Sequence, residues 1–369
     1  MRFLSLVLSA LLAIGAWFDK AQLHASEAGN FNPIIPTSIS SETIRSELTP
    51  SVRDAYAEIF ANNVYHVSQQ QGSILMPFVE MMGMVSTAKQ ITRLGTLSSP
   101  SLYTSRGERV VASNPATDVR WVTAQRYWQA CHVDSWDELR TLYSIQNAYS
   151  EAMSMSFGRL YDRVIIAAAL GTVYTGPSRD TAVALPDSQK YVSLDDSGDF
   201  APTGYKDLVK IRTRMKNKFA INKGQMLVYA CTANEVANFL MTTEIINRDY
   251  TNNLVLASGE VAAFMGFLFA ETQLIPEATT DFRHDANNNV VSSGGTSIDV
   301  STTAGKAVRT FCFVTGRSLC FGINMNMFSR VSERADLHYI IQLYYAAEFG
   351  AVRKEEVTVI EVLSQGKYS

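Results

Sequence analysis

The sequence has few of the residues that build disulfide-rich or catalytic sites. Its 369 residues include four cysteines and five histidines. No two cysteines form a C-x-x-C pair, and their low density argues against a disulfide scaffold. The metalloprotease motif H-E-x-x-H and the hydrolase motif G-x-S-x-G are absent as well. We therefore expect no enzyme, and we expect no catalytic residue, cofactor or metal ion.

One short segment comes close to a metal-binding motif and then departs from it. Asp285, Asn287 and Asn289 match the opening of a calcium-binding loop. The sixth position of that loop requires glycine and the twelfth requires glutamate. This chain has Val290 and Thr296 at those positions. The segment is therefore predicted to be an ordinary polar loop.

The chain also lacks a concentration of charge of one sign. Lysine and arginine number 32 against 35 aspartates and glutamates, and the formal net charge is −3. Without a basic tail, a histone-like or RNA-condensing role is not expected. Hydrophobic residues make up 47% of the sequence, which is typical of a globular protein. The length suits one large domain or two to three ordinary ones.

The N-terminus is apolar. Arg2 precedes an apolar run from Phe3 to Phe18, and Ser26-Glu27-Ala28 is similar to a signal-peptide cleavage site. The run is too short to span a bilayer comfortably. No Asn-x-Ser/Thr sequon occurs. We favour an uncleaved apolar helix or an upstream start codon, and export is the alternative.

The strongest helical pattern begins at a capping box, Ser135-Trp136-Asp137-Glu138, and stops at Gly171. Apolar residues recur along it every three or four positions, at Leu142, Ile145, Tyr149, Met153, Phe157, Leu160, Val164 and Ala168. We expect Leu160 and Val164 to be buried beneath an alternating strand that contains Leu337, Tyr339 and Ile341.

A second, basic helix is predicted over residues 205–220. Its apolar face contains Leu208, Ile211, Met215 and Phe219. The candidate inter-subunit or DNA-facing residues on its other side are Lys206, Lys210, Arg214 and Lys218. A merely solvated face is the alternative, because lysine-rich helices are usually solvated.

Several strands are predicted from alternation and apolar runs. A strand at 87–94 is followed by a loop rich in glycine and serine and then by return strands at 109–112 and 119–127. Buried strands are expected at 225–230 and 357–363. If residues 315–317 form a tight hairpin turn, Cys312 and Cys320 lie opposite each other and a disulfide is geometrically possible. The alternative is that both cysteines are small buried hydrophobic residues.

Three segments, taken in order, resemble the major capsid proteins of tailed bacteriophages, which have the Hong Kong 97-type fold. The first runs from Gly158 to Ala169 and is similar to the end of the family's long spine helix. The second runs from Arg248-Asp249-Tyr250 through Gly266-Phe267. The third runs from Glu333-Arg334-Ala335-Asp336 through Val362.

This resemblance implies an α+β fold with an N-terminal arm, an extended β-hairpin loop, a peripheral domain that contains the spine helix, and an axial domain. The implied division is 1–28 for the apolar segment, 29–82 for the arm, 83–133 for the hairpin, 134–203 for the peripheral domain, 204–328 for the axial domain with a surface loop at 276–306, and 329–369 for returning peripheral strands. Candidate hairpin contacts to a neighbouring subunit are Tyr103, Arg106 and Arg109.

The resemblance also implies a function. The chain would self-assemble, as pentamers and hexamers, into an icosahedral shell that encloses double-stranded DNA. Portal, scaffold or decoration proteins would be its other partners, with no membrane involved. It would assemble in the host cytoplasm and reside in the virion. The alternatives are an encapsulin-like protein shell and an exported surface or periplasmic protein.

Overall fold

The computed structural model describes five stretches of the chain. They are residues 72–133, apart from positions 98, 101, 103, 105, 108, 110, 111 and 113, and residues 145–222, 224–241, 263–300 and 307–366. All belong to the compact unit Phe60–Ser369. The apolar N-terminal segment, the capping box at Ser135, and Arg248-Asp249-Tyr250 lie outside the described residues. Within the described stretches, no helix is both long enough and apolar enough to cross a membrane.

The long helix α5 (Ile145–Leu170) confirms the predicted spine helix, and of its predicted apolar face Met153 and Phe157 are buried. Its other buried apolar residues are Ile165, Ile166, Ala169 and Leu170. Leu160 and Val164 are only half-buried at the flank of this face. The helix ends where the Gly171 amide donates to the Ala167 carbonyl, 2.8 Å away.

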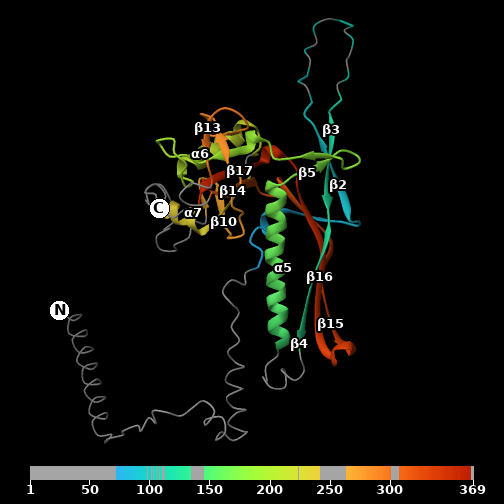
Figure 1. Ribbon diagram of the computed structural model, residues 1–369. Helices are drawn as coiled ribbons and strands as arrows, with labels where there is room; N and C mark the ends of the chain where they lie inside the picture. Colours follow the sequence, from blue (N-terminus) through green and yellow to red (C-terminus); the bar gives the residue numbers. More distant parts are fainter. Residues whose placement is uncertain are drawn as a thin grey trace, which may run out of the picture. The chain divides into compact units, whose positions relative to one another are not determined.

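A four-stranded sheet lies alongside α5, in the order β1 (Glu80–Gly83), β15 (Leu319–Arg334), β16 (Ile340–Arg353) and β4 (Gln125–Val133). Strands β15 and β16 form a long antiparallel hairpin next to the helix (Figure 1). Tyr161 of α5 packs edge-on against Phe349, with ring centroids 4.6 Å apart. Aromatic burial of this kind joins helix and sheet.

The strand predicted to contain Leu337 and Tyr339 begins later than expected. Both residues are exposed at the tip of the β15–β16 hairpin. The short 3-10 turn η3 (Ala335–Leu337) and left-handed backbone at His338 and Tyr339 reverse the chain there. Neither residue covers Leu160 or Val164, so that prediction was wrong. Ile341 lies inside β16 and does face the helix, in a small cluster with Met153.

A six-stranded sheet forms the second layer, in the order β7 (Lys190–Val192), β17 (Val359–Gln365), β14 (Ala307–Val314), β8 (Leu227–Cys231), β10 (Phe267–Glu271) and β9 (Ala263–Phe264). Helices α6 (Tyr205–Asn217) and α7 (Ala233–Met241) pack on one face, through residues such as Ile211 and Phe239. The other face belongs to the core that contains Ile165 of α5.

The buried strands predicted near 225–230 and 357–363 are therefore confirmed as β8 and β17. The C-terminal residues, however, do not stay in one sheet. β16 belongs to the sheet beside α5, whereas β17 lies inside the six-stranded sheet. β7, which we expected to be peripheral, pairs with β17 in that same sheet. The division expected at 329–369 is thus too simple.

Cys312 and Cys320 do not face each other. Cys312 lies in β14 opposite Tyr229, while Cys320 lies in β15 opposite Val352. Residues 315–317 carry the chain from one sheet to the other instead of closing a hairpin. Both cysteines are free and fully buried. Burial raises the pKa of the Cys320 thiol to about 11. The interpretation as small buried hydrophobic residues is confirmed.

Two smaller sheets complete the described residues. β11 (Phe282–His284), β12 (Val290–Val291) and β13 (Thr296–Ile298) form a three-stranded sheet within the region expected to be a surface loop. β2 (Ala88–Leu94), β3 (Thr117–Thr123), β5 (Val173–Thr175) and β6 (Thr181–Val183) form a four-stranded sheet. β2 and β3 are the two strands of the predicted hairpin.

Candidate assembly surfaces

The segment that joins β2 and β3 projects away from the strands that support it (Figure 1). Every described residue from Gly95 to Asn114 is exposed. Arg106 and Arg109, two of the predicted contact residues, lie in this segment. Tyr103, the third, lies outside the described residues. A long projection with no core of its own gains stability only by packing on something else.

The base of the projection is fixed by a network of charged side chains. Arg93 of β2 pairs with Asp118 of β3 at 2.7 Å and with Glu356 at 3.2 Å. Arg120 of β3 pairs with the same Glu356 at 2.7 Å and lies 3.6 Å from Asp118. Glu356, in the 3-10 turn η4 (Glu356–Thr358), therefore holds both strands of the hairpin.

Arg353 connects the same region to the end of α5. Its side chain is fully buried, and Nη1 donates to the carbonyls of Ala169 and Gly171 at 2.7 and 2.9 Å. A cation at a helix C-terminus is favoured by the helix dipole. Burial lowers the pKa of Arg353, and the nearby charge of Glu356 opposes that shift. Residues 353–356 thus join the spine helix to the hairpin base.

The hairpin strands also pass very close to the long sheet. A methyl group on Gly350 of β16 would collide with the backbone carbonyl of Thr123, at the end of β3. Gly322, its partner in β15, meets the side chains of Met84 and Val122 instead of backbone. Backbone atoms cannot move aside as a flexible side chain can. Glycine is therefore required at Gly350, where these two layers cross.

The face of the long sheet that points away from α5 carries uncovered aromatic residues. Trp128 of β4 is 70% exposed, and Phe328 of β15 is 41% exposed. Both rings lie against Tyr344 of β16, at centroid distances of 6.5 and 6.0 Å. We call Trp128, Phe328 and Tyr344 the outer aromatic cluster. Contiguous exposed apolar surface of this kind marks contact sites between proteins.

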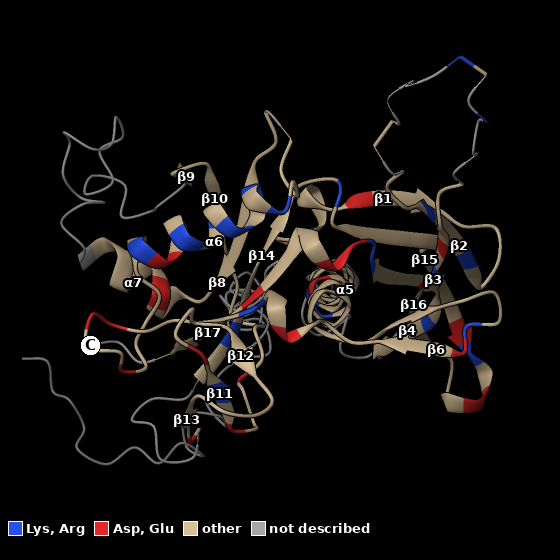
Figure 2. Cartoon of the chain, turned by 90° about the horizontal axis from the view of Figure 1, so that it is seen from above, with Lys and Arg blue, Asp and Glu red and all other residues tan. Residues whose placement is uncertain are grey.

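Lysine and arginine residues recur along the basic helix α6 (Figure 2). Two of the four predicted residues contact other parts of their own chain. Arg214 stacks over the Tyr191 ring at 5.3 Å and donates to the Asn287 carbonyl at 3.2 Å. Lys218 donates to the Ser188 carbonyl at 3.4 Å. Burial lowers the pKa of both basic groups. These two residues hold neighbouring loops.

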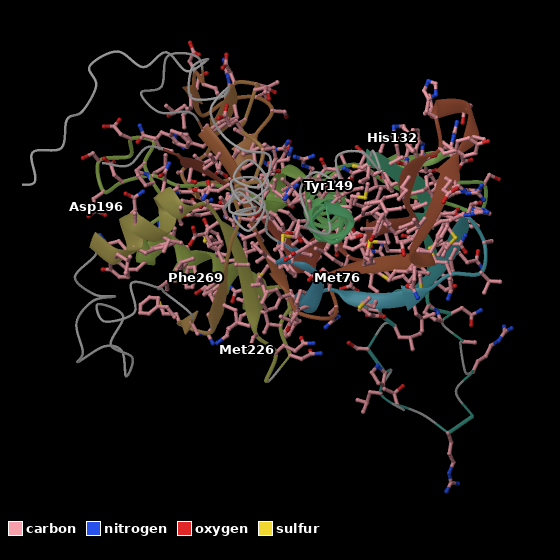
Figure 3. The ribbon with its side chains drawn as sticks, turned by 90° about the horizontal axis from the view of Figure 1, so that it is seen from below. Met76, His132, Tyr149, Asp196, Met226 and Phe269 are labelled. Carbon is pink, nitrogen blue, oxygen red and sulfur yellow. The ribbon has the colours of Figure 1, made fainter. Side chains whose placement is uncertain are left out.

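The other two predicted residues, Lys206 and Lys210, are exposed, as Lys218 is. Lys206 pairs with Asp196 at 2.7 Å, and this hydrogen bond lowers the pKa of the Asp196 carboxyl. Asp196 points outward from a loop in Figure 3. Lys210 is exposed one turn further along the helix. Of the four candidates, only Arg214 is half-buried, whereas Lys206, Lys210 and Lys218 are exposed and can meet another molecule.

The sequence analysis missed a buried carboxyl group in the first turn of α7. Glu235 accepts hydrogen bonds from Ser364 at 2.5 Å, Thr203 at 2.9 Å and Tyr229 at 3.2 Å. Burial raises its pKa. The pattern Thr232-x-x-Glu235 is a capping box and would have placed this residue at a helix start. Arg120, Arg353 and Glu356 carry no comparable local signal, because the network forms only in the folded chain.

Comparison with known proteins identifies the family of this chain. The family model for the phage capsid protein matches residues 52–365. The chain belongs to the phage capsid protein family.

Solved structures agree with this assignment. The capsid of Cyanophage P-SCSP1u aligns with a TM-score of 0.60 at 15% identity, covering 90% of this chain and all of that one. The capsid asymmetric unit of Cyanophage Pam1 aligns with a TM-score of 0.61 at 11% identity, covering 90% and 99%. A chain of Mycobacterium phage Bobi aligns at 0.54 and 15% identity, covering 89% and 100%. A search of curated protein sequences finds no significant match.

The capsid protein therefore has the Hong Kong 97-type fold that its sequence resembles. Its family is one of structural proteins, and the chain is a major capsid protein that forms a shell by self-association. As such it is a component of the virion. The α5 helix corresponds to the spine helix, and the β2–β3 projection corresponds to the extended hairpin of that fold.

Proposed function

We propose that this capsid protein builds an icosahedral shell of pentamers and hexamers around double-stranded DNA, and that the shell assembles in the host cytoplasm. The charge of the chain supports this proposal. With a formal net charge of −3 and no basic tail, the subunit is not built to condense nucleic acid. A shell that is filled by a motor needs no such tail. Portal, scaffold or decoration proteins complete the proposed set of partners.

The main support for the proposal is that a single chain leaves two surfaces exposed. The projection between β2 and β3 is exposed at every described residue from Gly95 to Asn114. The outer aromatic cluster is uncovered on the long sheet. In a closed assembly of identical subunits, a surface of each type on every copy can be buried against a neighbour. Many weak contacts per subunit then stabilise the shell together.

A firm base for the projection fits this role. Because Glu356 and Arg120 hold both strands where they leave the sheet, the projection is aimed in one direction before it meets a neighbour. Pre-organisation of this kind reduces the entropy lost on association. We also propose that Arg106 and Arg109, which lie in the projection, make polar contacts to the adjacent subunit.

Deletion of residues 97–105 tests the role of the projection. Loop tips tolerate such changes, so the subunit should fold with an unchanged unfolding midpoint. Assembly, measured by size-exclusion chromatography with light scattering, should be lost. Replacement of the same residues by a glycine-serine segment of equal length serves as the matched control for chain connectivity. A deletion variant that unfolds would place this segment in the core and contradict the proposal.

We also propose that Lys206 and Lys210 face either a neighbouring subunit or the packaged DNA. A Lys206→Glu and Lys210→Glu double variant separates the two roles. Contact with a neighbour predicts fewer shells of every kind, whereas contact with DNA predicts normal empty shells and fewer filled ones. Sedimentation counts both populations. Unchanged counts of both would show that these lysines are merely solvated.

A further inference from the structure

The residue that follows helix α6 is both strained and exposed. Phe219 has left-handed backbone, with φ at 54°, and its side chain is 87% exposed. Its amide donates to the Lys216 carbonyl at 3.0 Å, and the Ala220 amide donates to the Met215 carbonyl at 2.9 Å. This pair of hydrogen bonds ends many helices, and glycine usually occupies the left-handed position between them. Phe219 therefore does not belong to the apolar face predicted for α6.

A phenylalanine at this position has a cost and little benefit within the isolated chain. Left-handed backbone is unfavourable for a residue with a Cβ atom, and an exposed ring gains little from burial. Contact with another molecule explains a strained surface residue of this kind. Lys216 and Lys218 beside it are exposed as well, and Lys218 also donates to the Ser188 carbonyl at 3.4 Å. We call Lys216, Lys218 and Phe219 the α6 tip.

The opposite end of α6 carries negative charge. The loop before the helix exposes three aspartates, Asp195, Asp196 and Asp199. Asp196 pairs with Lys206, the second residue of α6, at 2.7 Å, so this loop lies at the N-terminal end of the helix. Among the described residues, no basic side chain pairs with Asp195 or Asp199. The loop therefore has negative charge to offer to another molecule.

Apolar surface lies at the base of the same loop. Leu194 and Phe200 form a β-bridge across it, and both are half-buried. Asp195 Oδ1 accepts the amides of Ser197 and Asp199, at 2.9 and 2.8 Å, which holds the loop in one conformation. We call residues 194–200 the acidic loop. It offers carboxylates beside partly exposed apolar side chains, and this matches the positive charge and the exposed ring of the α6 tip.

The two surfaces are too far apart to meet within one chain. Helix α6 has 13 residues, so its ends lie about 20 Å apart at a rise of 1.5 Å per residue. In a ring of identical subunits, a head-to-tail contact uses two different surfaces, one on each side of every copy. The two ends of α6 are such a pair of surfaces.

We propose that the α6 tip of one subunit docks on the acidic loop of the next subunit in a ring, an inference that rests on the proposed pentamers and hexamers. Its lysines pair with Asp195 and Asp199. Its aromatic ring covers Leu194 and Phe200. Charge complementarity orients such contacts, and a buried aromatic ring supplies much of their affinity. Duplex DNA is the other partner of suitable charge, but its phosphates bind lysine without an aromatic ring.

Phe219→Gly separates the contact from the fold. Glycine adopts left-handed backbone without strain, so the unassembled variant should unfold at the same urea concentration as the wild type or at a higher one. Its assembly should weaken. Light scattering over a concentration series should show half-assembly at about tenfold more protein or beyond, as expected for the loss of an aromatic anchor. A less stable variant, or one that assembles like the wild type, would overturn the proposal.

A charge exchange tests the partner surface. Lys216→Glu and Asp199→Lys each place like charges at the proposed contact, so each should weaken assembly about tenfold. Both residues are exposed, so neither change should destabilise the subunit. The double variant restores opposite charges in reverse and should assemble at nearly the wild-type concentration. Lys216→Glu combined with Glu333→Lys is the matched control, because it has the same net charge and should not recover.

Sedimentation of the assembled particles separates the remaining outcomes. A double variant that does not recover, while the wild type forms shells, would overturn the docking and leave the proposed function intact. Normal empty shells with fewer DNA-filled ones in Lys216→Glu would assign the α6 tip to DNA and overturn the docking as well. Wild-type subunits that stay monomeric would contradict both the docking and the proposed function.

Discussion

Replacement of Glu356 by glutamine is the most informative perturbation of the hairpin base. Glu356 is 13% exposed and holds Arg120, whose side chain is 3% exposed, at 2.7 Å. Glutamine keeps the shape of the side chain but removes its charge. The nearest remaining carboxylate, Asp118, lies 3.6 Å from the Arg120 guanidinium. Arg120 would then be a buried cation with one weak partner.

The expected loss of unfolding free energy in Glu356→Gln follows from the burial of Arg120. Breaking a fully buried ion pair costs about 3–5 kcal/mol, because the remaining charge stays unpaired away from water. Asp118 and the glutamine oxygen compensate in part, so we expect a loss of about 2–3 kcal/mol. The matched comparison is Asp118→Asn. Asp118 is 40% exposed, and its loss should cost less than about 1 kcal/mol, as for other solvent-screened pairs.

Urea unfolding of the unassembled subunit measures both values. Hydrogen exchange adds a local measurement, because amides of β2 and β3 should exchange faster in Glu356→Gln, with little change in β8. A Glu356→Gln variant that is no less stable than Asp118→Asn would refute the assignment of Glu356 as the anchor. Exchange that accelerates uniformly over the chain would refute the local character of the network.

Three further tests concern the packing of the core and the titration of Glu235. Gly350→Ala should destabilise the subunit by about 1–3 kcal/mol in urea unfolding, since the added methyl group meets the fixed carbonyl of Thr123. An unchanged unfolding midpoint would contradict the close approach of β16 to the end of β3. Ile165→Ala should lower the free energy of unfolding by about 2–5 kcal/mol and Leu160→Ala by clearly less, because Ile165 is fully buried and Leu160 only half-buried. The reverse order of the two losses would mean that the helix is rotated about its axis. Glu235 has a raised pKa in the folded state, so its contribution to stability is greatest below its unfolded pKa and is lost as the pH rises through its folded pKa. Glu235→Gln should therefore flatten the decline of stability as the pH rises above the ordinary glutamate pKa of 4.5, and parallel pH profiles would count against a titrating Glu235.

The elements with strong periodicity could be predicted from the sequence. The α6 helix begins at the predicted residue, and β8 and β17 each begin two residues after their predicted starts. These segments are specified locally, by an apolar face at helical spacing or by a continuous apolar run. The resemblance to the capsid family rested on the order of such segments, and the family match confirms it.

Features that depend on the packing of distant segments were not predictable. The buried face of α5 is centred on Ile165 and Ile166, because two different sheets meet the helix there and not one. Nothing in the local sequence at 315–317 distinguishes a hairpin turn from a crossover between sheets. The network of Arg93, Arg120 and Glu356 joins residues more than 200 positions apart, as the separation of 263 between Arg93 and Glu356 shows. Only the folded chain brings them together.

Electron microscopy of the purified full-length protein tests shell formation most directly. We predict closed particles in which the β2–β3 projection of each subunit lies against a neighbouring subunit. A subunit that stays monomeric in light scattering at high concentration and at several salt concentrations, with no particles in the micrographs, would contradict shell formation by this chain.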